Sequence, residues 1–361
     1  MNILIDIGHP GHVHLFRNTY FELKQKGHNV IVTTKDVPII LDLLQKYGID
    51  FIVLGKKPDG LFLKGLMIII HDIKLLGIVL KNKIRVGISS GLLLSHVSII
   101  SPLLTIICDD DDDKAEPLFV KFGHALASTV LSPYSIIRKT NKNLSYFGTH
   151  ELAYLHPKRF TPDNKVLRKV GINEADVFFL LRFVAFKGHH DIGHHGISTE
   201  QKIKIISILE KKGKVFITSE RAIEPELEMY RLKISPDDIH SLIFYSTMFI
   251  GDSQTMTSEA AILGVPALKC NTFAGKLSVP NMLEFKYRLC YSYLPEQFDD
   301  MLFKIEELLT NPNLKSMWQE KRQVFLEQNI DVTSYFTWFI ENYPESKILI
   351  EKDPSIQMKF K

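Results

Sequence analysis

The sequence predicts an α/β fold made of two Rossmann-like domains, each with a doubly wound parallel sheet, that face a central cleft. Strand-like and helix-like segments alternate from the start of the chain, which is the pattern of a parallel sheet with crossover helices. A second alternation of the same kind begins after residue 164. The 361 residues are 45% hydrophobic and 24% charged, so the chain can supply two cores of ordinary domain size.

The first half opens on a strand, a helix and a second strand. Residues 2–7 form a β-branched run, Pro10 and Gly11 interrupt it, residues 16–26 have helical spacing, and residues 29–33 are strand-like. The alternation continues through a helix, a strand, a helical stretch and two buried strands, which we expect at 38–47, 51–54, from 61, 86–89 and 104–108.

The connection between the domains is predicted within residues 146–164, where Gly148, Pro157 and Pro162 occur without a sustained hydrophobic period. The second half then repeats the alternation, with strands expected at 177–182, 214–218, 248–250 and 267–269 and helices at 199–211 and 258–263. The predicted domains are residues 1–155 and residues 156–331, and an aromatic helix at about 332–361 is expected to pack back on the first domain.

Charge and cysteine content exclude several classes of protein. Lys and Arg total 44 against 41 Asp and Glu, so the formal net charge of +3 does not indicate nucleic acid as a partner. The three cysteines are far apart, which suggests neither a disulfide framework nor a zinc site. No export signal is visible, so we expect a cytoplasmic protein. The apolar stretch 61–80 contains Lys64, His71, Asp72 and Lys74 and is predicted not to span a membrane.

The segment from Gly251 to Pro266 carries the clearest functional signal. A strand ends there in a loop of small and hydroxyl residues that opens into a helix, and such a helix start favours a phosphate group. Glu259 lies just inside the helix, where the two hydroxyls of a ribose are suitable partners for a carboxylate. The alternative is that the loop only caps the helix. The predicted nucleotide- and phosphate-binding residues here are Ser253, Gln254, Thr255 and Glu259.

This segment resembles the donor-binding loop and helix of GT-B glycosyltransferases and of the related UDP-GlcNAc 2-epimerases, in which an acid, a small residue, Leu-Gly-x-Pro and a following strand recur. Residues 8–14 and 26–30 resemble the N-termini of such glycosyltransferases, although the Gly-Thr-Arg-Pro-Glu start of the 2-epimerases is absent. Within this superfamily the chain is similar to an uncharacterised group of archaeal and bacterial proteins, whose signature is visible at 146–155. The resemblance implies two domains of the GT-B type.

The resemblance further implies a glycosyltransferase that moves a sugar from a nucleotide-diphosphate sugar to a glycan or lipid-linked acceptor, with inversion and without an essential metal such as Mg²⁺. No other cofactor is expected. Two alternatives stay open at this point. One is a nucleotide-sugar 2-epimerase or hydrolase, and the other is a sugar-nucleotide-binding protein without turnover.

Candidate catalytic residues follow the predicted strands of the first domain. His9, His12 and His14 come after the first strand, where an imidazole can titrate near neutral pH, and Gly11 lets a substrate approach the backbone. We expect His12 to be the base, with His14 and Asp109 as further candidates. A packing or capping role is the alternative for each histidine. The run of five aspartates at 109–113 is expected to be mostly a solvated loop, in which Asp109 or Asp110 could act as a base.

In the second domain, Arg182 and Ser219 end or follow predicted strands and are expected to contact phosphate or nucleotide. The glycine- and histidine-rich stretch 187–196 is interpreted as a polar loop rather than a metal site. Residues 61–85 combine apolar and basic side chains, which is typical either of a helix that lies on an anionic membrane surface or of an ordinary buried helix with a basic end.

Overall fold

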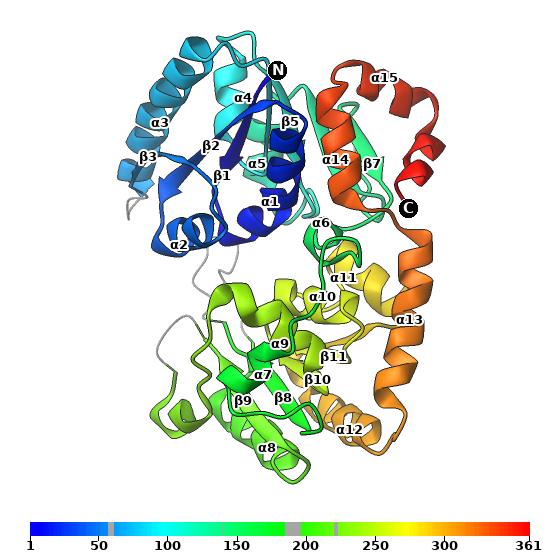
Figure 1. The fold of residues 1–361 in the computed structure, drawn as a ribbon. Coiled ribbons are helices and arrows are strands. Elements are labelled where there is room, and N and C mark those ends of the chain that lie inside the picture. The colour runs from blue at the N-terminus through cyan, green and yellow to red at the C-terminus, as the bar shows by residue number, and fades with distance from the viewer. Residues whose placement is uncertain (57–60, 139, 185–195, 220–222) are drawn as a thin grey trace. The chain divides into compact units, whose positions relative to one another are not determined.

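The chain folds into two compact units, each with its own parallel sheet (Figure 1). Unit 1 comprises residues 1–159 and 329–361, and unit 2 comprises residues 160–328. These boundaries lie within a few residues of those expected from the sequence. The computed structural model describes residues 1–56, 61–138, 140–184, 196–219 and 223–361.

Unit 1 contains seven parallel strands in the order β3-β2-β1-β4-β5-β6-β7. The central strands are short runs rich in Val, Ile and Leu, and they are buried because helices cover both faces of the sheet. The strands are β1 (Asn2–Ile7), β2 (Asn29–Asp36), β3 (Ile52–Lys56), β4 (Val86–Ser89), β5 (Leu104–Cys108), β6 (Thr129–Pro133) and β7 (Asn143–Tyr146).

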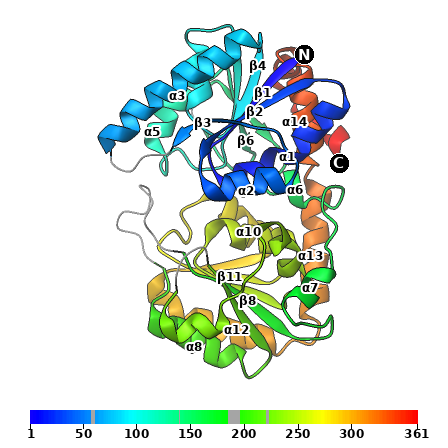
Figure 2. The ribbon, with the colours of Figure 1, turned by 60° about the vertical axis from the view of Figure 1, so that its left-hand side comes forward.

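The helices of unit 1 form two groups (Figure 2). Helix α1 packs against α2, α6 and α14, whereas α3 packs against α4, and α4 packs against η1. The helical segments are α1 (Pro10–Gln25), α2 (Pro38–Lys46), α3 (Leu61–Lys81), α4 (Leu93–Ser98), α5 (Pro117–Phe119), η1 (Val120–His124), α6 (Leu152–Leu155), α14 (Val332–Glu341), α15 (Glu345–Lys352) and η7 (Pro354–Phe360). None of the helices in the described part of the chain is long and apolar enough to span a membrane.

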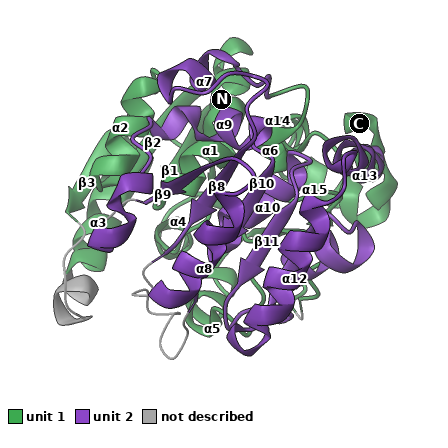
Figure 3. Ribbon diagram, turned by 90° about the horizontal axis from the view of Figure 1, so that it is seen from below, with its two compact units in different colours: residues 1–159, 329–361 green, residues 160–328 purple. Residues whose placement is uncertain are grey.

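The C-terminal segment belongs to unit 1, and α13 before it belongs to unit 2 (Figure 3). The aromatic residues Tyr335, Phe336 and Phe339 of α14 are fully buried, as expected for a packing face. The Arg159 side chain binds the Asp331 carboxylate at 2.6 Å and so holds the start of α14. A charged pair therefore reinforces the apolar contact between the chain's tail and unit 1.

Unit 2 contains five parallel strands in the order β12-β11-β10-β8-β9. Its strands are β8 (Phe178–Arg182), β9 (Lys214–Thr218), β10 (Met248–Gly251), β11 (Ala267–Cys270) and β12 (Cys290–Tyr293). Its helical segments are α7 (Lys165–Lys169), α8 (Thr199–Leu209), η3 (Pro225–Tyr230), η4 (Pro236–Asp238), α9 (Ile239–Tyr245), α10 (Gln254–Ile262), α11 (Ser278–Asn281), η5 (Met282–Lys286), η6 (Pro295–Gln297), α12 (Phe298–Leu309) and α13 (Leu314–Gln328).

Two helices begin earlier than the sequence predicts. Helix α1 starts at Pro10 instead of residue 16, because proline is favoured in the first turn, where its missing N–H costs nothing. Helix α10 starts at Gln254 instead of residue 258. Ser253 and Thr255, which the sequence places in a loop, are thus the cap and part of the first turn of α10. The unpaired N–H groups of the helix start therefore lie directly after β10.

Each sheet has a switch point, where one strand is followed by connections that lead in opposite directions. In unit 1 it lies between β1 and β4, and in unit 2 it lies between β8 and β10. Ligands of open parallel sheets bind at the carboxyl ends of such strands. At β10 this edge depends on Gly251, since a Cβ there would lie 2.1 Å from the carbonyl oxygen of Arg182.

Candidate functional site

The loop after β1 brings two predicted residues together at the switch point of unit 1. His9 is exposed, and its Nδ1 accepts a hydrogen bond of 3.2 Å from the N–H of Gly11, which caps α1. A Cβ at Gly11 would lie 3.2 Å from the same nitrogen, so a larger residue would crowd the cap. His9 and Gly11 therefore shape the turn that carries the chain from strand to helix.

His12 is half-buried in the first turn of α1, close to the same edge. Its Nδ1 accepts a hydrogen bond of 3.3 Å from the N–H of Gly8, which leaves the proton of the neutral imidazole on Nε2. Burial, together with the charges of His9 and His150, lowers the pKa of His12 to about 3. The geometry thus favours a neutral hydrogen-bond donor at His12 over the proton acceptor expected from the sequence.

His14 lies on the buried side of α1. Its ring packs against Tyr154 at 5.4 Å and against Tyr47 at 6.0 Å between centroids, and the residue is 8% exposed. These contacts are those of a core histidine, so the structure favours the packing alternative for this residue.

Asp109, which directly follows β5, is buried in a network of ion pairs. Its Oδ2 lies 2.8 Å from His124 Nε2 and 2.8 Å from Arg138 Nη2. The Arg138 guanidinium also donates to the carbonyl oxygens of Asp109 and Asp111 and pairs with Asp113. Asp109 therefore anchors the loop after β5. Its side chain is 6% exposed, so the neighbouring Asp110 is more accessible to a substrate.

Asp110 is a partly accessible carboxylate of this edge, with a side chain that is 36% exposed. Its Oδ1 lies 3.1 Å from Nδ1 of His150, which follows β7. Burial opposes both charges, but their attraction outweighs it, so the pKa of Asp110 is lowered and the pKa of His150 is raised. The pair thus favours the ionised form of Asp110 and the protonated form of His150.

The first three aspartates of the run are crowded, in contrast to the solvated loop expected for it. Carboxylate oxygens of Asp109, Asp110 and Asp111 lie within 4.8 Å of one another. Burial and the charges of its two neighbours raise the pKa of Asp111 to about 8, and burial and Asp110 raise that of Glu151 to about 7. Like charges at this spacing cannot all ionise without a large cost.

Replacing Asp111 by asparagine is expected to raise the melting temperature much more at pH 8.5 than at pH 5. An unfolded aspartate loses its proton near pH 4, whereas folded Asp111 keeps it up to about pH 8, so stability declines as the pH rises through that interval. Thermal unfolding of Asp111→Asn at the two pH values measures the effect. Asp112→Asn, in the same run, is the control, and equal shifts at both pH values would contradict the assignment.

In unit 2, the start of α10 combines a side-chain cap with the N–H groups of the first turn. Ser253 is the N-cap, and its Oγ accepts a hydrogen bond of 3.4 Å from the N–H of Met256. The Thr257 hydroxyl donates to the carbonyl oxygen of Ser253 at 2.6 Å. In the first turn, Gln254 is half-buried and Thr255 is exposed. First-turn N–H groups have no partner within a helix, and with the helix dipole they favour an anion.

Glu259 is buried in the middle of α10 and has a histidine partner. Its Oε1 lies 3.0 Å from Nε2 of His240 in α9, and the two side chains are 7% and 3% exposed. The sequence predicts that this acid binds the ribose hydroxyls. The structure adds that a histidine already holds one oxygen of the carboxylate and so orients it.

Arg182 and Ser219 lie at the same edge as the start of α10. Arg182 ends β8 and pairs in register with Thr218 of β9 on one side and with Gly251 of β10 on the other. Ser219 is the first residue after β9, and Ser253 is the second residue after β10. The predicted residues of unit 2 are thus carried by the ends of three neighbouring strands.

Asp252 lies between β10 and the cap of α10 and is 3% exposed. Its Oδ1 accepts a hydrogen bond of 2.7 Å from the N–H of Val184, and the N–H of Ile197 also binds it. Burial raises its pKa to about 6 despite these bonds. The carboxylate therefore ties the chain after β8 to the chain before α8. The histidines at 189–195 lie outside the described residues.

Several members of these clusters are not assigned from the sequence. His150 sits in a recognisable motif, and its place after a strand is the signal that could identify it. His240 and Lys269 lie inside a helix and a strand, where only the tertiary contacts reveal their partners.

Comparison with known structures shows the fold. The structure of spinosyn forosaminyltransferase SpnP superposes with a TM-score of 0.64 at 15% identity and covers 95% of this chain and 100% of that one. UDP-GlcNAc 2-epimerase from Neisseria meningitidis, bound to UDP-GlcNAc, superposes with a TM-score of 0.63 at 13% identity and covers 97% and 99%. The two parallel-sheet units therefore have the same overall fold as these two proteins.

Sequence comparison shows to which family the chain belongs. An uncharacterised protein of Methanocaldococcus jannaschii is 26% identical over 286 residues, which is 75% of this chain and 82% of that protein. The family model described as "protein of unknown function (DUF354)" matches residues 1–358. With almost its whole length matched, the chain belongs to this family.

Proposed function

We propose that the chain is an inverting glycosyltransferase that moves a sugar from a nucleotide-diphosphate sugar to a glycan or lipid-linked acceptor. The observation that carries the proposal is the start of α10, where a capped helix, Gln254 and Thr255 lie at the switch point of the second sheet. A diphosphate suits this position because it can accept several hydrogen bonds and balances the positive end of the helix dipole.

Unit 2 would hold the nucleotide and stabilise the leaving group. Transfer breaks the bond between the sugar's anomeric carbon and the diphosphate, and the negative charge that develops goes to the phosphate oxygens. First-turn N–H groups of α10 face that charge, with Arg182 at the neighbouring strand end, while Glu259 accepts from the ribose hydroxyls. Because these groups belong to the protein, the reaction should proceed in the presence of EDTA.

Unit 1 would activate the acceptor. An acceptor hydroxyl must lose its proton as it attacks the anomeric carbon, and Asp110 is the ionised and accessible carboxylate of that edge. His150 orients Asp110 through Nδ1, and His12 offers Nε2–H as a donor to the acceptor's oxygen. The base proposed from the structure is thus Asp110, with His12 as a binding group.

Product analysis tests the reaction type. We would incubate the protein in EDTA with UDP-, GDP- and dTDP-sugars labelled in the sugar, with and without a membrane extract that supplies acceptors. The proposal predicts that label moves to a glycan or lipid only when the extract is present, with release of nucleoside diphosphate. Isomerised sugar without an acceptor would instead identify an epimerase, and free labelled sugar alone would identify a hydrolase.

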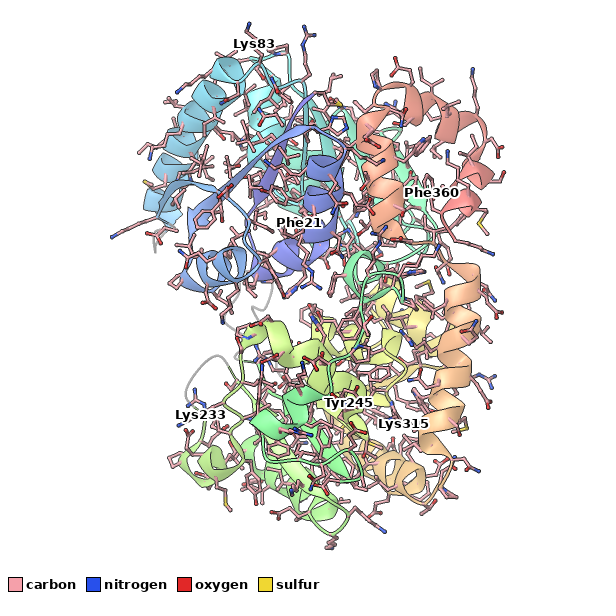
Figure 4. All side chains as sticks on the ribbon, viewed as in Figure 1. Phe21, Lys83, Lys233, Tyr245, Lys315 and Phe360 are labelled. Atoms are coloured by element: carbon pink, nitrogen blue, oxygen red, sulfur yellow. The ribbon has the colours of Figure 1, made fainter. Side chains whose placement is uncertain are left out.

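A lipid-linked acceptor would place unit 1 at a membrane surface. On α3 the side chains of Ile69, Ile73 and Leu80 are 57%, 64% and 54% exposed, and Ile100, after the neighbouring α4, is 67% exposed. Exposed basic residues follow α3, among them Lys83, which projects from its end in Figure 4. Apolar side chains beside basic ones suit the headgroup layer of an anionic bilayer.

Flotation of the protein with vesicles tests this contact. We expect it to float with vesicles that contain anionic phosphatidylglycerol and to stay behind with vesicles of phosphatidylcholine alone. The double variant Ile69→Ser/Ile73→Ser should lose flotation while it keeps its thermal stability, because both side chains are exposed. Equal recovery with both vesicle types, or none with either, would exclude an anionic membrane as a partner.

A further inference from the structure

Lys269 is a lysine in the interior of unit 2. It lies on β11 and is 1% exposed, so its ammonium is removed from water. In the described part of the chain, the only hydrogen-bond partner of this ammonium is the side-chain Oε1 of Gln254, a neutral group. An ammonium has three donors, and burial without a counter-ion costs far more than one amide bond returns.

The orientation of Gln254 follows from this contact. Since an ammonium can only donate, the oxygen of the Gln254 amide must face Lys269, and the amide NH₂ must point away from it. The Nε2 of Gln254 is buried and has no hydrogen-bond partner among the described residues. Gln254 is also the first residue of α10. A donor without a partner is therefore fixed at the helix end that favours an anion.

The other titratable groups around Lys269 do not neutralise it. Glu284 of η5 and Cys290 of β12 influence its charge from a distance, and neither makes an ion pair or hydrogen bond with the ammonium. Burial raises the pKa of the Cys290 thiol to about 12, so that neighbour is uncharged. Among the described residues, the buried ammonium and the start of α10 thus form a positive region in which no carboxylate pairs directly with Lys269.

We propose that Lys269 is a positioning residue for the diphosphate of the nucleotide sugar, that it acts through the side chain of Gln254, and that the protein takes up a proton on Lys269 when the diphosphate binds. The ammonium holds and polarises the amide, whose NH₂ then donates to a phosphate oxygen. This inference rests on the proposed function and adds a residue and a proton to it.

The direction of the proton linkage follows from the charges. Burial lowers the pKa of Lys269 to about 8 in the unliganded chain. A bound dianion favours the charged lysine and raises that pKa, so a fraction of Lys269 that is neutral at pH 8.5 becomes protonated on binding. The proton comes from the buffer and ends on Nζ. At pH 6.5 the lysine is already charged, and no uptake at this site is expected.

Calorimetric titration tests the proton. We would titrate UDP, ADP, GDP and CDP into the full chain at pH 8.5 in two buffers of different ionisation enthalpy, and take the tightest binder. Wild type should take up part of a proton at pH 8.5 and less at pH 6.5. Lys269→Met should bind at least about tenfold more weakly and lose the uptake. Lys214→Met, an exposed lysine on β9, is the matched control and should behave as wild type.

Two further results separate this role from a structural one. Because a buried charge without a counter-ion destabilises the fold, Lys269→Met should melt at the same or a higher temperature than wild type without nucleotide. If Lys269 acts through Gln254, the double variant with Gln254→Ala should bind no more weakly than either single variant. Unchanged affinity in Lys269→Met, or binding without proton uptake, would overturn this inference alone. Failure of all four nucleotides to bind wild type would overturn the proposed function itself.

Discussion

Asp110→Asn is expected to lower kcat of the proposed transfer by about 10²- to 10⁴-fold and to leave the affinity for nucleoside diphosphate unchanged. The size is that of a lost general base, because asparagine cannot accept the acceptor's proton. The affinity should hold because Asp110 belongs to unit 1, whereas the proposed nucleotide-binding residues belong to unit 2. Single-turnover rates and calorimetric titration of the same preparation measure the two quantities.

Two variants sharpen this result. Asp112→Asn, two residues away in the same run, should keep nearly full activity. His150→Gln should lower kcat less than Asp110→Asn and should move the acidic limb of the pH profile upward, because His150 holds the pKa of Asp110 below its usual value. Full activity in Asp110→Asn would remove Asp110 from the mechanism. If Asp110→Asn also lost affinity for the nucleotide, Asp110 would have a structural role.

Glu259→Gln is expected to weaken nucleotide binding by about 10- to 100-fold, which corresponds to the loss of a hydrogen bond to a charged acceptor. The loss should shrink with a nucleotide that lacks the ribose 2′-hydroxyl, because one of the two hydroxyl partners of the carboxylate is then missing in both proteins. Titration of wild type and variant with the tightest of UDP, ADP, GDP and CDP, and with its 2′-deoxy form, gives the comparison.

The matched control for this comparison is Glu306→Gln, an exposed acid on α12 that should bind both nucleotides as wild type does. His240→Asn should lie between wild type and Glu259→Gln, since it frees the carboxylate without removing it. If wild type bound the ribose and deoxyribose forms equally, and Glu259→Gln bound both as wild type does, Glu259 would have no contact with the sugar and its pair with His240 would be structural.

Most of the fold is readable from the sequence because local patterns dictate it. The strands at 86–89, 104–108 and 214–218 agree with the structure to the residue, since each is a short buried run between turn-forming residues. The starts of α1 and α10 were wrong by several residues. Residues such as Pro10 and Ser253 are common in loops, but they are also favoured in the first turn or at the cap of a helix. Only the backbone conformation shows which of the two roles such a residue has.

The candidate site is readable only in part. Strand ends identify His9, His12, Arg182 and Ser253 as residues of the two switch points, because topology alone places them there. The contact partners of the site residues cannot be predicted from the sequence in this way. The contact of Asp110 with His150 joins positions 40 residues apart in the sequence, and local spacing does not encode which carboxylate is buried and which is exposed.

The measurement that tests the central claim most directly is a thermal-shift panel with UDP, ADP, GDP and CDP, each compared with its nucleoside monophosphate. A ligand that binds only the folded chain must raise its melting temperature. We expect a rise with at least one diphosphate, a much smaller rise with the matching monophosphate, and a smaller rise in Glu259→Gln than in wild type. No shift with any of the four diphosphates would contradict a nucleotide-binding role for α10.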